Sequence, residues 1–147
     1  MAGVSKPTLS RLASGLHSAS IRLLRGLRRS DSRFGVGPAR LSALSVLVYA
    51  GPRTPSELAE IEQVRSPTMT KVLRGLAEQG LARIEASPDD GRSKIASATA
   101  RGRRLLERAR QARVDRLESA LATLPREDRA VLQRAVKILQ GLPVSSE

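Results

Sequence analysis

The chain has 147 residues and a mass of 15.8 kDa, and 40% of its residues are hydrophobic, which suits one compact domain. Because it has no cysteine and one histidine, disulfides, thiolate nucleophiles and histidine-rich metal sites are excluded, and we expect neither a metal nor a cofactor. The formal net charge of +12 indicates an anionic partner; no segment approaches the roughly 18 apolar residues of a membrane span.

The positive charge is concentrated in two parts of the chain. The net charge is +6 over residues 1–33, −1 over 34–64, +7 over 65–116 and 0 over 117–147. This distribution favours nucleic acid over a membrane surface as the partner, although an arginine-rich solvated surface is the alternative. The N-terminus lacks the apolar core of a signal peptide, which predicts a cytoplasmic protein.

Two helices are predicted in the first third of the chain. Apolar residues recur every three or four positions over 8–29, which indicates a long helix with a narrow seam for another helix, within the chain or in a partner subunit. The glycines and proline of 34–38 interrupt the pattern, and a second helix follows over 39–50 until Gly51 and Pro52 stop it.

Two short helices follow, over 54–63 and 66–79. Thr54 and Glu57 have the spacing of a capping box, and Pro55 suits the first helical position. In the second helix Ser66 is the predicted cap, Pro67 lies in the first turn, and Gly80 ends the helix. Only a few residues separate the two helices, as in a helix-turn-helix.

The rest of the chain predicts a hairpin and two more helices. Residues 81–86 and 93–99 are expected to be strands around the turn sequence "SPDDGRSK" (87–94). Thr99 can cap a helix to about residue 122, and a last helix starts at Pro125. The expected fold is therefore mainly α with a small two- or three-stranded antiparallel β wing: a winged helix-turn-helix flanked by long helices. Since a helix fits the major groove, this arrangement suits duplex DNA.

Residues 37–106 resemble the winged helix-turn-helix core of the MarR family, the multiple antibiotic resistance regulators. The resemblance lies in "SPTMTK" at 66–71, in "L..L...GL..R" from Leu73 to Arg83, and in the wing "DDGR" ahead of "T..G" at Thr99 and Gly102. It implies a homodimeric transcriptional regulator, a repressor, that binds a pseudo-palindromic site in double-stranded DNA and is released by a small-molecule effector. Residues 1–147 would form one domain, with dimerisation helices at 1–33 and 100–147 and a DNA-binding lobe at 37–99.

The expected DNA-binding residues lie on the second short helix and on the wing. The resemblance implies that Arg92 enters the minor groove and that Asp90 orients it. Alternatively, "PDDG" is only a polar turn, and Lys71 and Arg74 only solvate a surface helix; a magnesium site at Asp89 and Asp90 would lack further acidic ligands. The predicted DNA contacts are Ser66, Pro67, Thr68, Thr70, Lys71, Arg74, Arg92 and Lys94.

The sequence indicates less clearly which residues would bind a small-molecule effector. His17, on the first helix, and Tyr49 are the candidate pocket residues, but the chain has only two aromatic side chains with which to stack a ligand. Two other functions remain open: a sequence-independent, nucleoid-type DNA-binding protein, and a protein-interaction module that no longer reads DNA. We do not expect an enzyme, because the sequence offers no Ser/His or Cys/His pairing and no phosphate-binding glycine loop.

Overall fold

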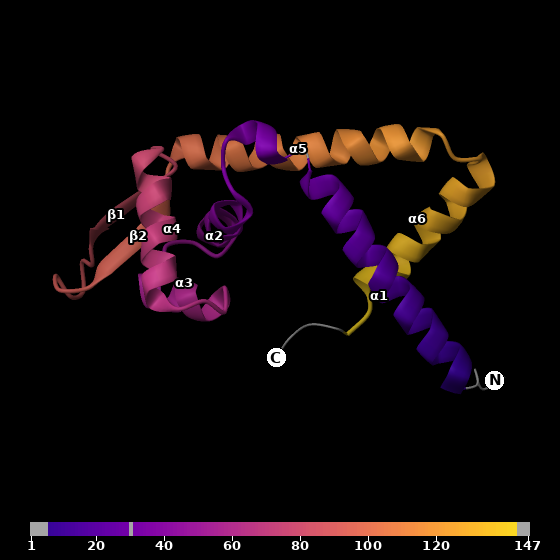
Figure 1. Cartoon of the computed structure of the whole chain (residues 1–147), viewed down its shortest axis with the longest axis horizontal. Coiled ribbons are helices and arrows are strands. Elements are labelled where there is room, and N and C mark those ends of the chain that lie inside the picture. The colour runs from indigo at the N-terminus through magenta and orange to yellow at the C-terminus, as the bar shows by residue number, and fades with distance from the viewer. Residues whose placement is uncertain (1–5, 30, 144–147) are drawn as a thin grey trace. The chain divides into compact units, whose positions relative to one another are not determined.

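The computed structural model describes residues 6–29 and 31–143, and it confirms the expected mainly helical fold with one small antiparallel sheet (Figure 1). Each helix and strand predicted from the sequence is present within a few residues of its expected bounds. The elements are α1 (Lys6–Arg28), the 3-10 turn η1 (Asp31–Phe34), α2 (Pro38–Tyr49), α3 (Pro55–Ile61), α4 (Ser66–Glu78), β1 (Ala82–Ala86), β2 (Lys94–Ala98), α5 (Ala100–Ala122) and α6 (Arg126–Gln140).

Two details differ from the expectation. The turn η1 was not predicted, because the glycines and proline that follow it mark only an interruption. Ser66 is not the cap of α4: the helix begins at Ser66 itself, and the carbonyl of Arg65 accepts from the backbone N–H groups of Thr68 and Met69. The start moves by one residue because proline is tolerated throughout the first helical turn, where its missing N–H has no partner to lose.

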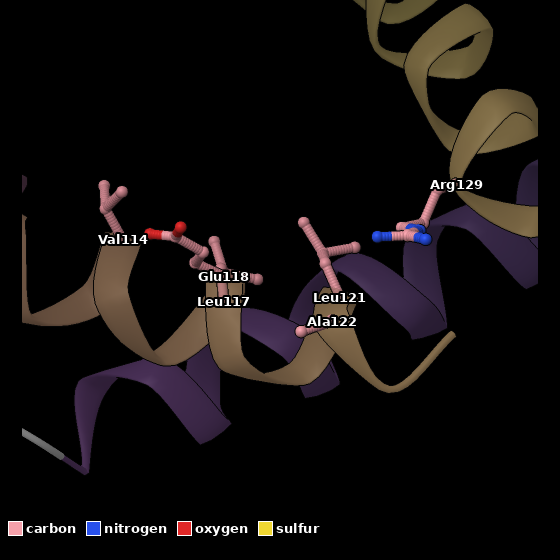
Figure 2. A pocket seen from close by; sticks show the side chains of 6 residues that line it. All are labelled: Val114, Leu117, Glu118, Leu121, Ala122 and Arg129. Carbon is pink, nitrogen blue, oxygen red and sulfur yellow. The ribbon is translucent and has the colours of Figure 1, made fainter. Parts of the chain in front are cut away.

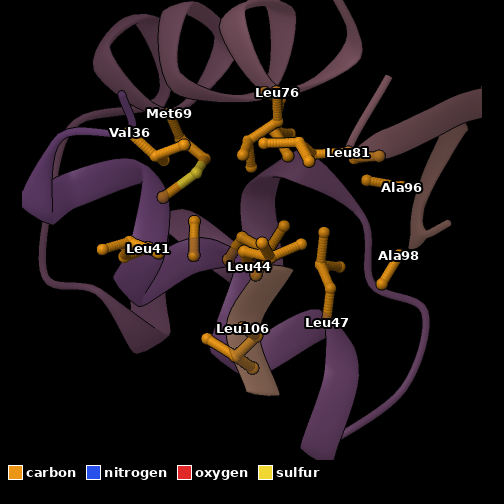
Figure 3. Close-up of a cluster of buried hydrophobic side chains, with 14 of the residues drawn as sticks. Val36, Leu41, Leu44, Leu47, Met69, Leu76, Leu81, Ala96, Ala98 and Leu106 are labelled. Carbon is orange, nitrogen blue, oxygen red and sulfur yellow. The ribbon is translucent and has the colours of Figure 1, made fainter. Parts of the chain in front are cut away.

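The hydrophobic core lies between α2, α4, the sheet and the start of α5. Figure 3 shows Leu44 and Leu47 of α2 in one cluster with Leu76 of α4, Leu81 and Leu106. Each of these leucines is at most 6% exposed, and burying such a side chain contributes about 1.5–3 kcal/mol. This core fixes α4 against the rest of the lobe.

The start of α5 is held tightly against the end of α4. Gly80 has a φ of 67°, which ends α4 in the left-handed conformation that glycine adopts without strain. The hydroxyl of Thr99 donates to the carbonyl of Gly80 over 2.7 Å and accepts from the N–H of Gly102 over 3.0 Å, so the predicted cap is confirmed. A Cβ at position 102 would collide with the carbonyl oxygen of Leu81, which explains the glycine there.

The wing is a hairpin with a short third contact. Strand β1 pairs antiparallel with β2, with Ile84 opposite Ala96 at its centre. Arg53, between α2 and α3, forms an isolated bridge to Ala96 through two backbone hydrogen bonds of 3.0 and 2.8 Å. The bridge ties the wing to the segment that leads into the helix-turn-helix.

The chain forms two compact units, residues 1–113 and residues 114–147, and the boundary falls inside α5. The first unit contains the core just described. In the second unit, none of the residues of α6 is buried. Within the described ranges, no helix is both long enough and apolar enough to cross a membrane.

Candidate nucleic-acid interface

The first helix of the helix-turn-helix is fixed by the predicted capping box. The N–H of Glu57 donates to the hydroxyl of Thr54 over 3.2 Å, and the N–H of Thr54 donates to the carboxylate of Glu57 over 2.7 Å. The backbone hydrogen bond from Thr54 is the main cause that lowers the pKa of the Glu57 carboxyl, with the Thr54 hydroxyl and nearby Arg53 adding to it. Reciprocal bonds of this kind define where α3 begins.

The turn between α3 and α4 contains a strained residue. Gln63 has a φ of 53°, a left-handed conformation in which glycine is favoured over other residues. The turn is closed by the N–H of Val64, which donates to the carbonyl of Ala59 over 2.9 Å. This conformation reverses the chain in few residues, so that α4 packs against α3.

Helix α4 presents one apolar and one polar face. Met69, Leu73 and Leu76 are buried, each at most 2% exposed. The predicted contact residues are all exposed: Ser66, Pro67, Thr68, Thr70, Lys71 and Arg74. No side chain caps the N-terminus of α4, and its 13 residues carry no acid in the first turn, so the positive end of the helix dipole is left uncompensated by the helix itself.

A groove of about 380 Å³ separates α4 from the wing. Its floor is apolar, and three of the predicted DNA contacts, Thr70, Arg74 and Lys94, line it together. The Thr70 hydroxyl also donates to the carbonyl of Ser66 over 3.0 Å, which leaves its oxygen able to accept a further bond. The structure thus brings cations from a helix and from a strand to one groove.

The tip of the wing is held by hydrogen bonds within the turn. The carboxylate of Asp90 accepts the backbone N–H of Arg92 over 3.0 Å, and the carbonyl of Asp90 accepts the N–H of Ser93 over 3.0 Å. We expected this carboxylate to hold the Arg92 guanidinium, and the contact found is a different one. An aspartate commonly bonds the backbone two residues on, because this satisfies the turn locally. The Arg92 side chain itself is exposed.

The two candidate effector residues lie apart from a cavity of the first unit. His17 is exposed on α1, and Tyr49 is 71% exposed at the end of α2. Neither lines the cavity of about 130 Å³ that α1, α2 and α5 enclose, whose wall includes Arg28, Ser42 and Ser45.

An ion pair that the sequence analysis missed forms part of that cavity. The guanidinium of Arg113 donates from Nε to Asp31 Oδ1 over 3.0 Å and from Nη2 to Oδ2 over 2.7 Å. Asp31 is 6% exposed, so Arg113 supplies the two hydrogen bonds that water does not. The sequence offered one sign of this ion pair. Arg113 is a cation in the apolar stripe of α5, where a charge needs a counterion.

Two surfaces remain apolar and exposed, each within its own unit. On α1, six leucine and isoleucine side chains between Leu9 and Leu24 are 38–67% exposed. In the second unit, α6 exposes Val131, Leu132, Val136, Ile138 and Leu139, and a groove of about 500 Å³ runs along the end of α5. Figure 2 shows this groove, with Leu117 and Leu121 on α5 and Arg129 extending toward them from α6.

Comparisons with known proteins agree on one family. Residues 34–93 match the model of the MarR family. The chain is 40% identical over 133 residues to an uncharacterised HTH-type transcriptional regulator of Mycobacterium bovis, an alignment that covers 90% of this chain and 93% of that protein. A candidate transcriptional regulator from Pseudomonas aeruginosa has a similar structure, with a TM-score of 0.80, 32% identity, and coverage of 97% of this chain and 100% of that one.

A second similar structure was solved with nucleic acid. It is a MepR mutant of S. aureus bound to an oligodeoxyribonucleotide, with a TM-score of 0.70, 16% identity, and coverage of 88% of this chain and 95% of that one. At this identity the likeness concerns the fold alone. Together with the 40% identical relative, whose length is almost fully covered, the match to the family model is decisive. The chain belongs to the MarR family of winged helix-turn-helix transcriptional regulators.

Proposed function

We propose that this protein is a homodimeric repressor that binds a pseudo-palindromic DNA site and is released by a small-molecule effector. The observation that carries the DNA-binding part is the convergence of Thr70, Arg74 and Lys94 on one groove between α4 and the wing. Because the protein would bind DNA, it would act where the chromosome is, in the cytoplasm of a bacterial cell. Residues 1–33 and 100–147 would form the dimer, and 37–99 the DNA-binding lobe.

The geometry of α4 supports entry into the major groove. A helix is about 10–12 Å across with its side chains, and the groove is about 12 Å wide. The exposed face of α4 carries Lys71 and Arg74, and the positive end of the helix dipole at its N-terminus, which no side chain caps, favours a phosphate. In this orientation the wing extends beside α4, where Arg92 would enter the neighbouring minor groove, whose negative potential attracts a guanidinium.

The exposed apolar side chains support a dimer. Helix α6 has a strongly apolar stripe, yet none of its residues is buried within the chain. A helix gains most of its stability by packing such a stripe, so α6 needs a surface beyond its own unit, residues 114–147. A second copy supplies that surface by symmetry, and most soluble oligomers are symmetric homo-oligomers.

The effector is the least constrained part of the proposal. The cavity around Asp31 and Arg113 is small, about 130 Å³, and both polar groups already satisfy one another. An effector in this cavity would contact Arg28, Ser42 and Ser45 at its wall, since His17 and Tyr49 do not line it. Thermal-shift screening against small molecules, with Ser45→Leu as the blocked-cavity control, tests whether this site takes a ligand.

The DNA-binding function is tested by selecting bound duplexes from a random pool at about physiological salt. The affinity of the best duplex is then compared with that of a scrambled one over a salt series. We expect an enriched inverted repeat, with half-sites about 34–36 Å apart and a preference of about 10³-fold or more. The net charge of +12 favours the competing function, a sequence-independent DNA-binding protein; no enrichment and a steep loss of affinity with salt would establish that function instead. If no duplex is bound, the remaining function is that of a protein-interaction module that no longer reads DNA.

A further inference from the structure

Helix α4 contains a glycine in its interior, where glycine weakens a helix relative to alanine. This residue, Gly75, is buried by the side chain of Arg40 from α2. A Cβ built at position 75 would lie 2.5 Å from Nε, Cζ and Nη2 of Arg40. The guanidinium therefore lies against the backbone of α4 in the space that a side chain at position 75 would fill.

The position of this guanidinium on α4 is set by the helical repeat. Residues 68, 71 and 75 follow at steps of three and four, so they share one stripe of the helix. The guanidinium of Arg40 consequently lies one turn beyond Lys71, on the stripe that begins with Thr68. Arg40 is partly exposed, and within the described ranges no carboxylate lies within 4.0 Å of it.

This stripe lies on the flank of α4 away from the wing. Thr68 and Thr70 are two residues apart and therefore project about 160° apart around the helix axis. Thr70 faces the groove beside the wing, where Arg74 and Lys94 lie, whereas Thr68 and Gly75 lie on the flank that α2 approaches. Helix α4 thus has cations along both flanks, one of them supplied by a different helix.

A helix in the major groove lies between two phosphate backbones, one on each side. We propose that Arg40 is a DNA-contacting residue, which binds a phosphate on the strand away from the wing. This inference rests on the proposed DNA-binding function. A guanidinium bonds a phosphate through charge-assisted hydrogen bonds, and its placement on α4 before binding reduces the side-chain freedom lost on binding. A phosphate contact sets orientation and adds affinity without reading sequence.

The test measures the affinity of the full chain for its selected duplex and for a scrambled duplex over a salt series. Arg40→Ala is compared with Arg108→Ala, which removes the same charge from an exposed position on α5. We expect Arg40→Ala to reduce the slope of log affinity against log salt by about 0.9, and to weaken both duplexes by the same factor, about tenfold. Arg108→Ala should change neither by more than about twofold.

Gly75→Ala separates the position of the guanidinium from its charge. The added methyl displaces the end of a flexible side chain, so the fold should be retained, which circular dichroism and the melting temperature verify. We expect this variant to bind DNA as weakly as Arg40→Ala, and the double variant Arg40→Ala/Gly75→Ala to bind no more weakly than either. Gly26→Ala, a helical position with open space around its Cβ, is the control.

Each outcome decides one claim. If Arg40→Ala behaves as Arg108→Ala does, Arg40 makes no DNA contact and the inference is wrong. If Arg40→Ala weakens binding while Gly75→Ala does not, the position of the guanidinium against Gly75 does not direct the phosphate contact. The claim that α4 places the guanidinium for DNA is then overturned. If the wild-type chain itself binds no duplex, the proposed function fails first, and this inference fails with it.

Discussion

Residues 38–98 bury most of their apolar side chains against one another, whereas α6 leaves its own exposed. In the lobe, Leu44, Leu58 and Leu76 have no exposed surface. In α6, Val136 and Ile138 are 51% and 64% exposed, although the helix is as clearly amphipathic as α4. Helix formation and core formation are therefore separate demands: α4 meets both within its own unit, and α6 leaves the second to another surface.

The largest effect should come from emptying the core of the lobe. Leu76→Ala removes a fully buried side chain, and we expect it to lower the free energy of unfolding by about 3 kcal/mol. Leu139→Ala, at a position 41% exposed, should cost less than about 1 kcal/mol at concentrations that favour single chains. Guanidinium denaturation at low concentration measures both, and equal losses would mean that α6 is packed within its own chain.

A charge on α6 tests whether the exposed apolar stripe of this helix packs against a second copy of the chain. Val136→Glu places a carboxylate on the exposed apolar stripe, and we expect the dissociation constant of the proposed dimer to rise about 100-fold with the secondary structure unchanged. Sedimentation velocity over a dilution series measures it. Gln133→Glu adds a similar charge to the polar side of α6 and should leave the dimer intact. Dimers of undiminished strength in Val136→Glu would remove α6 from the interface.

The Arg113–Asp31 ion pair lies at the end of the first unit and should contribute to its stability. Arg113→Ala leaves the nearly buried carboxylate of Asp31 without its counterion, and we expect a loss of about 2 kcal/mol in stability. The side chain of Arg113 is 29% exposed, so water offsets part of the effect. Arg116→Ala, an exposed arginine one turn further along α5, is the matched control for chemical denaturation. Indistinguishable curves would show that the pair contributes no stability.

The lobe also contains one position where a substitution should stabilise it. Gln63→Gly relieves a left-handed conformation, with an expected gain of about 1 kcal/mol in the free energy of unfolding. Ala50→Gly, at an exposed residue with a φ of −100°, should instead lose about 0.5–1 kcal/mol, because there glycine only adds freedom to the unfolded chain. Chemical denaturation would contradict this account if both variants shifted in the same direction.

The smallest effect is a pH dependence at the start of α3. Because the folded pKa of Glu57 is lowered, its contribution is complete above the ordinary range of a glutamate carboxyl and is lost as the pH falls through the folded pKa. Glu57→Gln should therefore flatten the fall in melting temperature between about pH 5 and pH 3. Glu60→Gln, on the same helix but outside the capping box, should leave the fall as steep as in the wild type.

The sequence predicted the features that depend on neighbouring residues. The Thr54–Glu57 capping box, the glycine that ends α4 and the Thr99 cap all join residues at most a few positions apart or mark a helix end, so spacing alone reveals them. The fold class followed from the order of these elements. The predicted DNA contacts are exposed as required, but their role stays a prediction.

Contacts between distant residues could not be predicted in the same way. Asp31 and Arg113 are 82 positions apart, and Arg40 meets Gly75 only because α2 packs across α4. Nothing in a local pattern specifies which helices cross or at which residues. The hydrogen bond from the Arg92 backbone to Asp90 was not predicted, because the sequence shows an acid and an arginine two positions apart but not that the backbone amide bonds the carboxylate. That Asp90 orients the Arg92 side chain on DNA stays a prediction.

The closed turn at the wing tip has a consequence for how such proteins diversify. Its shape depends on Asp90, Ser93 and backbone amides, while the side chain of Arg92 takes no part in holding it. Residue 92 can therefore be exchanged during evolution without rebuilding the loop that carries it. With Arg92 in the minor groove, as proposed, a gene duplicate could acquire a new minor-groove preference through a single codon, and drift away from its ancestor's targets while its fold stays the same.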